Sequence, residues 1–162
     1  VLVNTSFRPF SPFFHRLRPR NYAALLRLAL RPRSAEAIER TVWRLTSNAP
    51  DPRNAVIGAW VAARTRHPVS PINALRQLVA AARYRAPTAA PNPRILLLTS
   101  QSDQLVDSRC SLAIARSWHC ALAVHPQAGH DLPLDAPQWV IEQVQQWLAH
   151  TAPSQRAPAT DP

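Results

Sequence analysis

The stretch that most constrains the fold is an uninterrupted apolar run, RILLLTS, at residues 94–100. Such a run is typical of a β-strand buried on both faces, as the strands of parallel sheets are. A helix is predicted to follow at residues 107–118, and a second apolar run, CALAVH, predicts a second buried strand at residues 120–125. Strand, helix, strand and helix at this spacing predict a parallel α/β unit over residues 94–150. The last helix, at residues 135–150, is amphipathic, and its expected inner face consists of Val140, Val144, Trp147 and Leu148.

The preceding part of the chain is predicted to be mostly helical. It begins with VLVN, a short β-branched, apolar run that suits a buried strand. An irregular loop rich in proline, arginine and aromatic residues is expected at residues 5–20. Residues 7–90 as a whole are expected to form a helical block, whose helices lie in the segments 21–30, 34–47, 51–67 and 70–85.

Capping residues mark the helix starts in this block. Ser34 and Ser70 are placed to cap a helix, and Asp51-Pro52 combines a capping residue with a proline in the first turn. Apolar residues at helical spacing predict one buried face on each of two helices. These faces consist of Ile38, Val42 and Leu45 on the first, and of Ile72, Leu75, Val79 and Ala82 on the second.

Length and composition limit the class of protein. A chain of 162 residues, 46% of them hydrophobic, is long enough for one domain with its own core and is not disordered. No apolar run approaches the roughly 18 residues that span a bilayer. The two cysteines, Cys110 and Cys120, are interpreted as reduced thiols of a cytoplasmic protein. The sequence contains no methionine, and we therefore expect it to be a piece of a longer protein.

The charge is unevenly distributed, and all 19 basic residues are arginine. Residues 1–102 carry 16 arginines against three acidic residues, a net charge of +13, whereas residues 103–162 have a net charge of −3. A basic surface attracts nucleic acid, anionic lipid or an acidic substrate. No RNA-binding, helix-turn-helix, zinc-finger or phosphate-loop motif is present, so no nucleic-acid partner is expected. A non-enzymatic protein whose basic half binds an anionic partner remains an alternative function.

Polar residues with catalytic chemistry follow both apolar runs in the last third of the chain. Asp103 lies in the loop SQSDQLVD at residues 100–107, and His130 lies in the loop PQAGHDLPLD at residues 126–135. The carboxyl ends of adjacent parallel strands lie at the same edge of a sheet, so we expect these two side chains to meet. An aspartate that accepts a hydrogen bond from one imidazole nitrogen fixes the tautomer, and the other nitrogen then acts as a general base.

Residues 94–148, which contain both loops, resemble the C-terminal end of an α/β-hydrolase. That family places its catalytic groups in the chain order nucleophile, acid, histidine. The resemblance implies that Asp103 is the acid after the seventh strand and that His130 is the histidine after the eighth. It also implies that VLVN is the sixth strand and that residues 7–90 are cap and packing helices. The expected fold class is therefore α/β, the C-terminal part of an α/β-hydrolase fold with three parallel strands, flanking helices and a helical cap-like block.

The function implied by this resemblance is hydrolysis of a small carboxylic ester or related acyl substrate through a Ser-Asp-His triad, without a cofactor. The nucleophile elbow G-x-S-x-G is missing, because the chain has only Gly58, in a predicted helix, and Gly129, next to the histidine. We therefore expect a partial domain at residues 1–150 and a flexible tail at 151–162, without activity of their own. The nucleophile would come from a longer chain or from the partner chain of a split hydrolase. The unpaired edge of the first strand predicts self-association.

Other polar residues near the candidate site have less specific explanations. Asp107 and Asp135 are interpreted as helix caps, and Asp131 as a surface or salt-bridging residue. Four serines lack the strained turn of a nucleophile elbow: Ser6, Ser100, Ser102 and Ser111. Residue types that bind zinc also occur, but no metal is expected because the spacing fits no zinc pattern: His119, Cys120, His125, His130 and Asp131.

Overall fold

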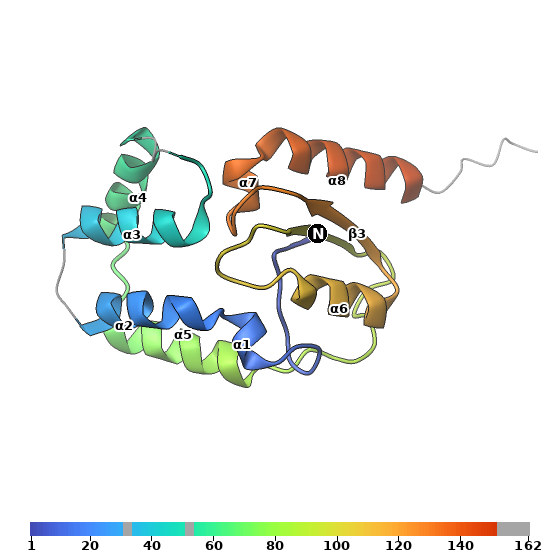
Figure 1. Cartoon of the computed structure of the whole chain (residues 1–162), viewed down its shortest axis with the longest axis horizontal. Helices are drawn as coiled ribbons and strands as arrows, with labels where there is room; N and C mark the ends of the chain where they lie inside the picture. Colours follow the sequence, from blue (N-terminus) through green and yellow to red (C-terminus); the bar gives the residue numbers. More distant parts are fainter. Residues whose placement is uncertain (31–33, 51–53, 152–162) are drawn as a thin grey trace, which may run out of the picture.

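The structure of the protein is a computed structural model that describes residues 1–30, 34–50 and 54–151. Its centre is a parallel sheet in the order β1-β2-β3, made of β1 (Leu2–Val3), β2 (Leu96–Ser100) and β3 (Ala121–His125) (Figure 1). Leu97 of β2 lies opposite Leu2 on one side and Leu122 on the other. All residues of β2 are buried, as the apolar run predicts. The expected sheet of three parallel strands is confirmed.

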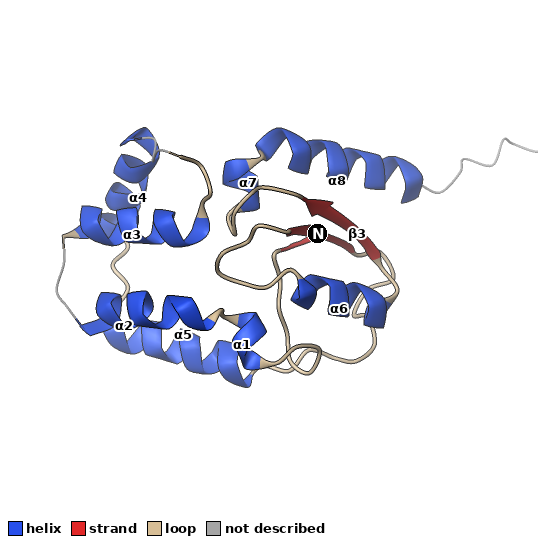
Figure 2. Ribbon diagram, in the orientation of Figure 1, coloured by secondary structure: helices blue, strands red, loops and turns tan. Residues whose placement is uncertain are grey.

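Helices cover both faces of the sheet. Figure 2 shows α6 (Arg109–Trp118) on one face, and α7 (Leu132–Asp135) and α8 (Pro137–Thr151) on the other. Successive side chains of β2 alternate between these layers. Leu97 packs with Ile114 in the cluster beneath α6, whereas Leu98 packs with Leu132 in the cluster beneath α7 and α8. The central strand therefore contributes to two separate cores.

Three expectations about burial in the sheet and its helices are wrong. The run VLVN predicts a buried strand, but Leu2 and Val3 of β1 are only half-buried. β3 lies where the second apolar run predicts it, but it is an edge strand and is only partly buried; Val124 is 45% exposed. An edge strand pairs on one side only, so its apolar residues are less enclosed than those of β2. Leu148 of α8 is 48% exposed, while Val140, Val144 and Trp147 pack on the sheet. At 100° per residue, Leu148 is turned about 80° away from Val140 around the helix axis.

The first part of the chain is helical, as predicted. Its elements are α1 (Phe13–Arg16), the 3₁₀ helix Pro19–Asn21, α2 (Tyr22–Leu30), α3 (Ala35–Thr46), α4 (Asn54–Arg66) and α5 (Pro71–Arg83). The expectation of an irregular loop at residues 5–20 is therefore wrong in part, because α1 and most of the 3₁₀ helix lie within it. Ser34 and Ser70 cap α3 and α5, accepting hydrogen bonds from Ala37 N at 3.2 Å and Asn73 N at 3.3 Å.

Some sequence expectations lie outside the described residues. The Asp51-Pro52 helix start is one of them, and the expected tail is another, apart from Thr151. Among the described helices, none is both long and apolar enough to cross a membrane.

The buried face of α3 differs from the predicted one. Its buried residues are Glu39 and Trp43, whereas Ile38, Val42 and Leu45 are only half-buried. The cause is the packing of α4, whose Trp60 contacts Trp43 with ring centroids 5.9 Å apart, and whose Arg64 forms an ion pair with Glu39.

The predicted apolar face of α5 is not buried against any described segment. Residues 72–83 are all exposed, and Ile72 and Leu75 are more than half exposed, at 54% and 55%. The periodicity of the sequence therefore identified the helix correctly, but the expected burial of this face is wrong.

Asp107 joins the start of α6 to the segment that precedes α2. Its carboxylate accepts hydrogen bonds from Arg109 N at 3.0 Å, Nε at 2.9 Å and Nη2 at 2.8 Å. Arg18 lies 3.6 Å away on the other side. Asp107 thus holds the first turn of α6 from the position before Ser108, which is the N-cap residue of this helix.

Acid is expected to weaken this anchor. The hydrogen-bonded Arg109 guanidinium, helped by Arg18, holds the pKa of the Asp107 carboxyl well below its usual range. Since the folded-state pKa lies below the unfolded one, the carboxylate stabilises the fold above about pH 4, and this contribution is lost as the pH falls further. We expect Asp107→Asn to lower the free energy of unfolding by about 1–3 kcal/mol at pH 7. Urea unfolding of both proteins at several pH values measures this difference in the free energy of unfolding.

The difference between wild type and Asp107→Asn should shrink as the pH falls from about 4 towards 2. Glu142→Gln, at an exposed position on α8, is the matched control and should change the free energy of unfolding little. A constant difference across the whole pH range would contradict the role given to the Asp107 carboxylate.

Candidate active site

The loops that follow β2 and β3 bring Asp103 and His130 into contact. His130 Nδ1 lies 2.8 Å from Asp103 Oδ2, within hydrogen-bond distance. The Asp103 side chain is 1% exposed and that of His130 is 29% exposed. The other carboxylate oxygen, Oδ1, accepts hydrogen bonds from Leu105 N at 2.7 Å and Val106 N at 3.0 Å. The two side chains therefore meet as the order of the strands predicts.

The contact with Asp103 distinguishes the two imidazole nitrogens of His130. A carboxylate in its ionised form only accepts hydrogen bonds, so in that form it pairs with the tautomer that carries its proton on Nδ1. The other ring nitrogen, Nε2, is then an acceptor in the neutral ring. Within the described part of the chain, no hydrogen bond joins Nε2 to a protein group. The pair is arranged to take a proton at Nε2 and to stabilise the resulting imidazolium.

His130 lines a hollow of about 370 Å³ between the helical block and the sheet. Its apolar walls come from Val3, Val42, Trp60 and Pro133. Glu39 and Asp131 also line it. Asp131 was expected at the surface or in a salt bridge; it lies next to His130 and precedes the first turn of α7.

Asp135 is not a helix cap, contrary to the sequence interpretation. Its Oδ2 accepts hydrogen bonds from Gly129 N at 2.6 Å and Asn48 N at 2.8 Å, and its Oδ1 accepts one from Ser47 Oγ at 2.5 Å. The side-chain amide of Asn48 in turn donates to Ser102 O at 3.0 Å and Gln127 O at 2.9 Å. The end of α3 is thus bound to both candidate loops by side chains that the sequence pattern did not single out.

Gly129 allows this close approach. A Cβ atom at this position would lie 2.5 Å from Thr46 O, 2.9 Å from Asn48 N and 2.9 Å from Asp135 Oδ2. Two of these atoms belong to the backbone, so no side-chain rotation can move them away from the added Cβ atom. The glycine before His130 is therefore required by packing against the end of α3.

The two glycines of the chain offer a matched test of this packing. We expect Gly129→Ala to lower the free energy of unfolding by about 1–3 kcal/mol, because the end of α3 must move away from the His130 loop. Gly58→Ala, in the interior of α4 with no atom within 4 Å of the added Cβ, should raise it. The expected gain is about 0.5–1 kcal/mol, from the better helix propensity of alanine. Chemical denaturation of both variants measures the difference.

Equal tolerance of alanine at both positions would contradict the close approach of α3 to the His130 loop. The sign of the Gly58→Ala effect provides the internal control, since it depends only on α4.

The hydroxyls of three of the four serines considered above donate to backbone oxygens and not to His130. Ser102 donates to Pro126 O at 2.7 Å and Ser111 to Thr5 O at 3.1 Å, while Ser100 donates to Ala128 O. In the described residues, no serine hydroxyl is hydrogen-bonded to His130. Burial raises the pKa of the thiols of Cys110 and Cys120, which keeps them protonated and poorly nucleophilic at neutral pH.

The residues considered for zinc do not form a site. Across the described ranges, no group of three or more histidine, cysteine, aspartate or glutamate side chains is placed to hold a metal ion. His119 ends α6 with a left-handed backbone, at a φ of 49°. His125 Nδ1 accepts hydrogen bonds from Gln127 N at 3.2 Å and Ala128 N at 2.9 Å, which shapes the turn before His130.

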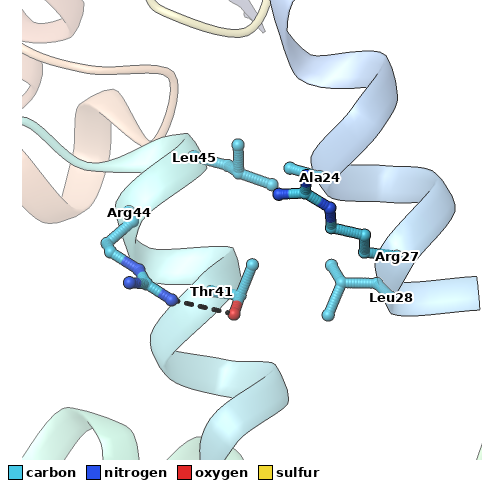
Figure 3. Close-up of a pocket in the computed structure, with 6 residues that line it drawn as sticks. All are labelled: Ala24, Arg27, Leu28, Thr41, Arg44 and Leu45. Atoms are coloured by element: carbon cyan, nitrogen blue, oxygen red, sulfur yellow. Dashed lines mark hydrogen bonds between the residues drawn. The ribbon is translucent and has the colours of Figure 1, made fainter. Parts of the chain in front are cut away.

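A second hollow, of about 270 Å³, lies between α2 and α3 (Figure 3). Leu28 points from α2 towards Thr41, and Leu45 points from α3 towards Ala24. Arg27 extends from α2 towards Leu45. Arg44 donates a hydrogen bond to Thr41 Oγ1 at 3.1 Å on the same helix. This hollow shares α3 with the one at His130 but contains neither member of the Asp103–His130 pair.

Comparison with solved structures identifies the fold. A thermophilic esterase from Thermogutta terrifontis superposes with a TM-score of 0.59 and 22% identity, over 92% of this chain and 54% of its own. The 2-hydroxy-6-oxo-6-phenylhexa-2,4-dienoate hydrolase from Rhodococcus sp. strain RHA1 gives a TM-score of 0.62 and 18% identity, over 91% of this chain and 54% of its own. The chain has the α/β-hydrolase fold. The chain spans about half the length of these structures, consistent with the C-terminal portion of the α/β-hydrolase fold.

Neither protein-family models nor curated protein sequences match the chain. The arrangement of the strands and helices therefore carries the similarity to these solved structures.

Proposed function

We propose that the chain provides the acid, Asp103, and the base, His130, of a Ser-Asp-His triad in a hydrolase. The observation that carries this proposal is the 2.8 Å contact between the two side chains, at the carboxyl ends of neighbouring parallel strands in an α/β-hydrolase fold. In such folds catalytic groups lie at this edge of the sheet, and the acid precedes the histidine in the chain. By the same correspondence, β1, β2 and β3 are the sixth, seventh and eighth strands.

The reaction is acyl transfer to a serine and then to water. Nε2 of His130 removes the serine proton as the hydroxyl oxygen attacks the carbonyl carbon, and Asp103 stabilises the imidazolium that forms. The imidazolium gives this proton to the leaving alkoxide when the ester bond breaks. Nε2 then takes a proton from water, which attacks the acyl-enzyme, and returns it to the serine. No cofactor takes part.

The substrate is proposed to be a small carboxylic ester or related acyl compound. The hollow at His130 has about 370 Å³ and apolar walls from Val3, Val42, Trp60 and Pro133, which suit a small apolar group. Two of the similar structures are an esterase and a 2-hydroxy-6-oxo-6-phenylhexa-2,4-dienoate hydrolase. The nucleophile is proposed to come from residues other than those described, on the same polypeptide or on a partner chain.

The direct test is to measure ester hydrolysis by the protein in the form that its source organism makes. We expect His130→Ala to lower kcat about 10⁴-fold or more, and Asp103→Asn to lower it by a similar order, because each removes part of the proton-transfer pair. KM should change much less. His67→Ala, at an exposed position after α4, is the matched histidine control and should leave kcat unchanged.

Residues 1–162 alone are expected to show no turnover of an activated ester. Turnover by this chain that is lost in His130→Ala would contradict the proposal that the nucleophile lies elsewhere. Full activity of His130→Ala in the native protein would contradict the triad itself.

Self-association through the first strand stays a prediction. β1 pairs with β2 on one side, and among the described residues no strand pairs with its other side. An open strand edge is a template for pairing with another chain. We expect residues 1–162 to form dimers or larger species at micromolar concentration in sedimentation velocity experiments. A monomer that unfolds in one cooperative transition would show that the edge is protected.

A further inference from the structure

Asn4 lies at the carboxyl end of β1, is 4% exposed, and connects three parts of the site. Its side-chain nitrogen donates to His130 O at 2.6 Å and to Gly129 O at 3.2 Å. Its side-chain oxygen accepts hydrogen bonds from Ser100 N at 2.8 Å and from Thr99 Oγ1 at 3.3 Å. A primary amide offers two donors and two acceptor positions, and all four are used here.

The backbone of Asn4 is in the left-handed region, with a φ of 43°. Asparagine tolerates this region better than most residues, but glycine adopts it at lower cost. The backbone conformation alone would therefore favour glycine. The four hydrogen bonds of the side chain explain why an asparagine is present instead. Unfavourable backbone conformations of this kind concentrate at functional sites.

The partners of Asn4 belong to both candidate loops. Ser100 is the last residue of β2, three positions before Asp103, and the other partner is the backbone of His130 itself. One buried side chain thus fixes the distance between the end of β2 and the backbone that carries the imidazole. The low dielectric of the interior makes an unpaired amide costly, so loop arrangements that break the hydrogen bonds of Asn4 are disfavoured.

We propose that Asn4 is a positioning residue that holds His130 in register with Asp103, an inference that rests on the proposed function. It touches neither the substrate nor the reacting atoms. Its effect passes through the backbone of His130 to the hydrogen bond between Nδ1 and the Asp103 carboxylate. Without Asn4, the imidazole loses this alignment, and the proton is no longer confined to Nδ1.

The tautomer of His130 is the readout, because a merely structural role would not change it. Nitrogen NMR of residues 1–162, labelled with ¹⁵N in histidine, separates the Nδ1–H and Nε2–H forms at high pH. Asn4→Gly keeps the left-handed backbone accessible and removes only the amide. Asn4→Asp keeps the size of the side chain but replaces both donors by an acceptor. Ile114→Val, in the core beneath α6, is the control that lowers stability without touching the loops.

The wild-type protein and Ile114→Val are expected to show His130 mainly as the Nδ1–H tautomer. In Asn4→Gly and Asn4→Asp, the ratio of Nδ1–H to Nε2–H should fall about tenfold, the change expected from loss of one hydrogen bond to a charged group. The dispersion of amide signals shows whether each variant is folded. One folded Asn4 variant is sufficient for the comparison with the wild-type protein.

The outcomes separate the two proposals. If a folded Asn4 variant keeps the wild-type tautomer ratio, the positioning role is wrong and the Asp103–His130 pair stands without it. If Ile114→Val changes the ratio as much as the Asn4 variants do, the effect is one of general stability and the positioning role is again wrong. If the wild-type protein itself lacks the Nδ1–H form, the pair is not formed, and the positioning role fails together with the proposed function.

Discussion

The parallel pairing of β2 with both of its neighbours is the constraint on which the rest of the structure depends. Leu97 lies between Leu2 and Leu122, and this register sends the carboxyl ends of all three strands to one edge of the sheet. A shift of one residue would exchange the two faces of β2, which pack against different helices. The loops that carry Asp103 and His130 begin at that edge, so the register of the core also sets the contact between them.

Polar groups rather than apolar contacts define the site beyond the strands. The Asp103 carboxylate is 1% exposed and accepts two backbone hydrogen bonds besides that of His130. Asp135 and Asn48 bind the end of α3 to the same loops. The buried Asp103 carboxylate would be costly if unpaired, so its hydrogen bonds favour one arrangement of the loops. The α3–α4 pair is thereby placed beside His130, where it forms one wall of the hollow.

Local sequence patterns predicted the elements and the candidate pair well. Three of these predictions depend on neighbouring residues only, and the structure agrees with each. They are the strand within the apolar run at residues 94–100, the helix caps Ser34 and Ser70, and the position of each candidate residue after its strand. The same patterns were poor guides to burial. The face of α3 that is buried carries Glu39 and Trp43, because α4 offers Arg64 and Trp60 as partners. α5 has a regular apolar face whose residues are all exposed.

The sequence by itself determined the order of the strands and helices, their approximate limits and the loops in which Asp103 and His130 lie, because these depend on residues close together in the chain. Only the tertiary structure decided which polar side chains support the pair. Asn4 is 126 positions from His130, and Asp135 binds a backbone amide 87 positions away at Asn48. Such partners leave no local pattern, since their contact exists only after the sheet has brought distant segments together.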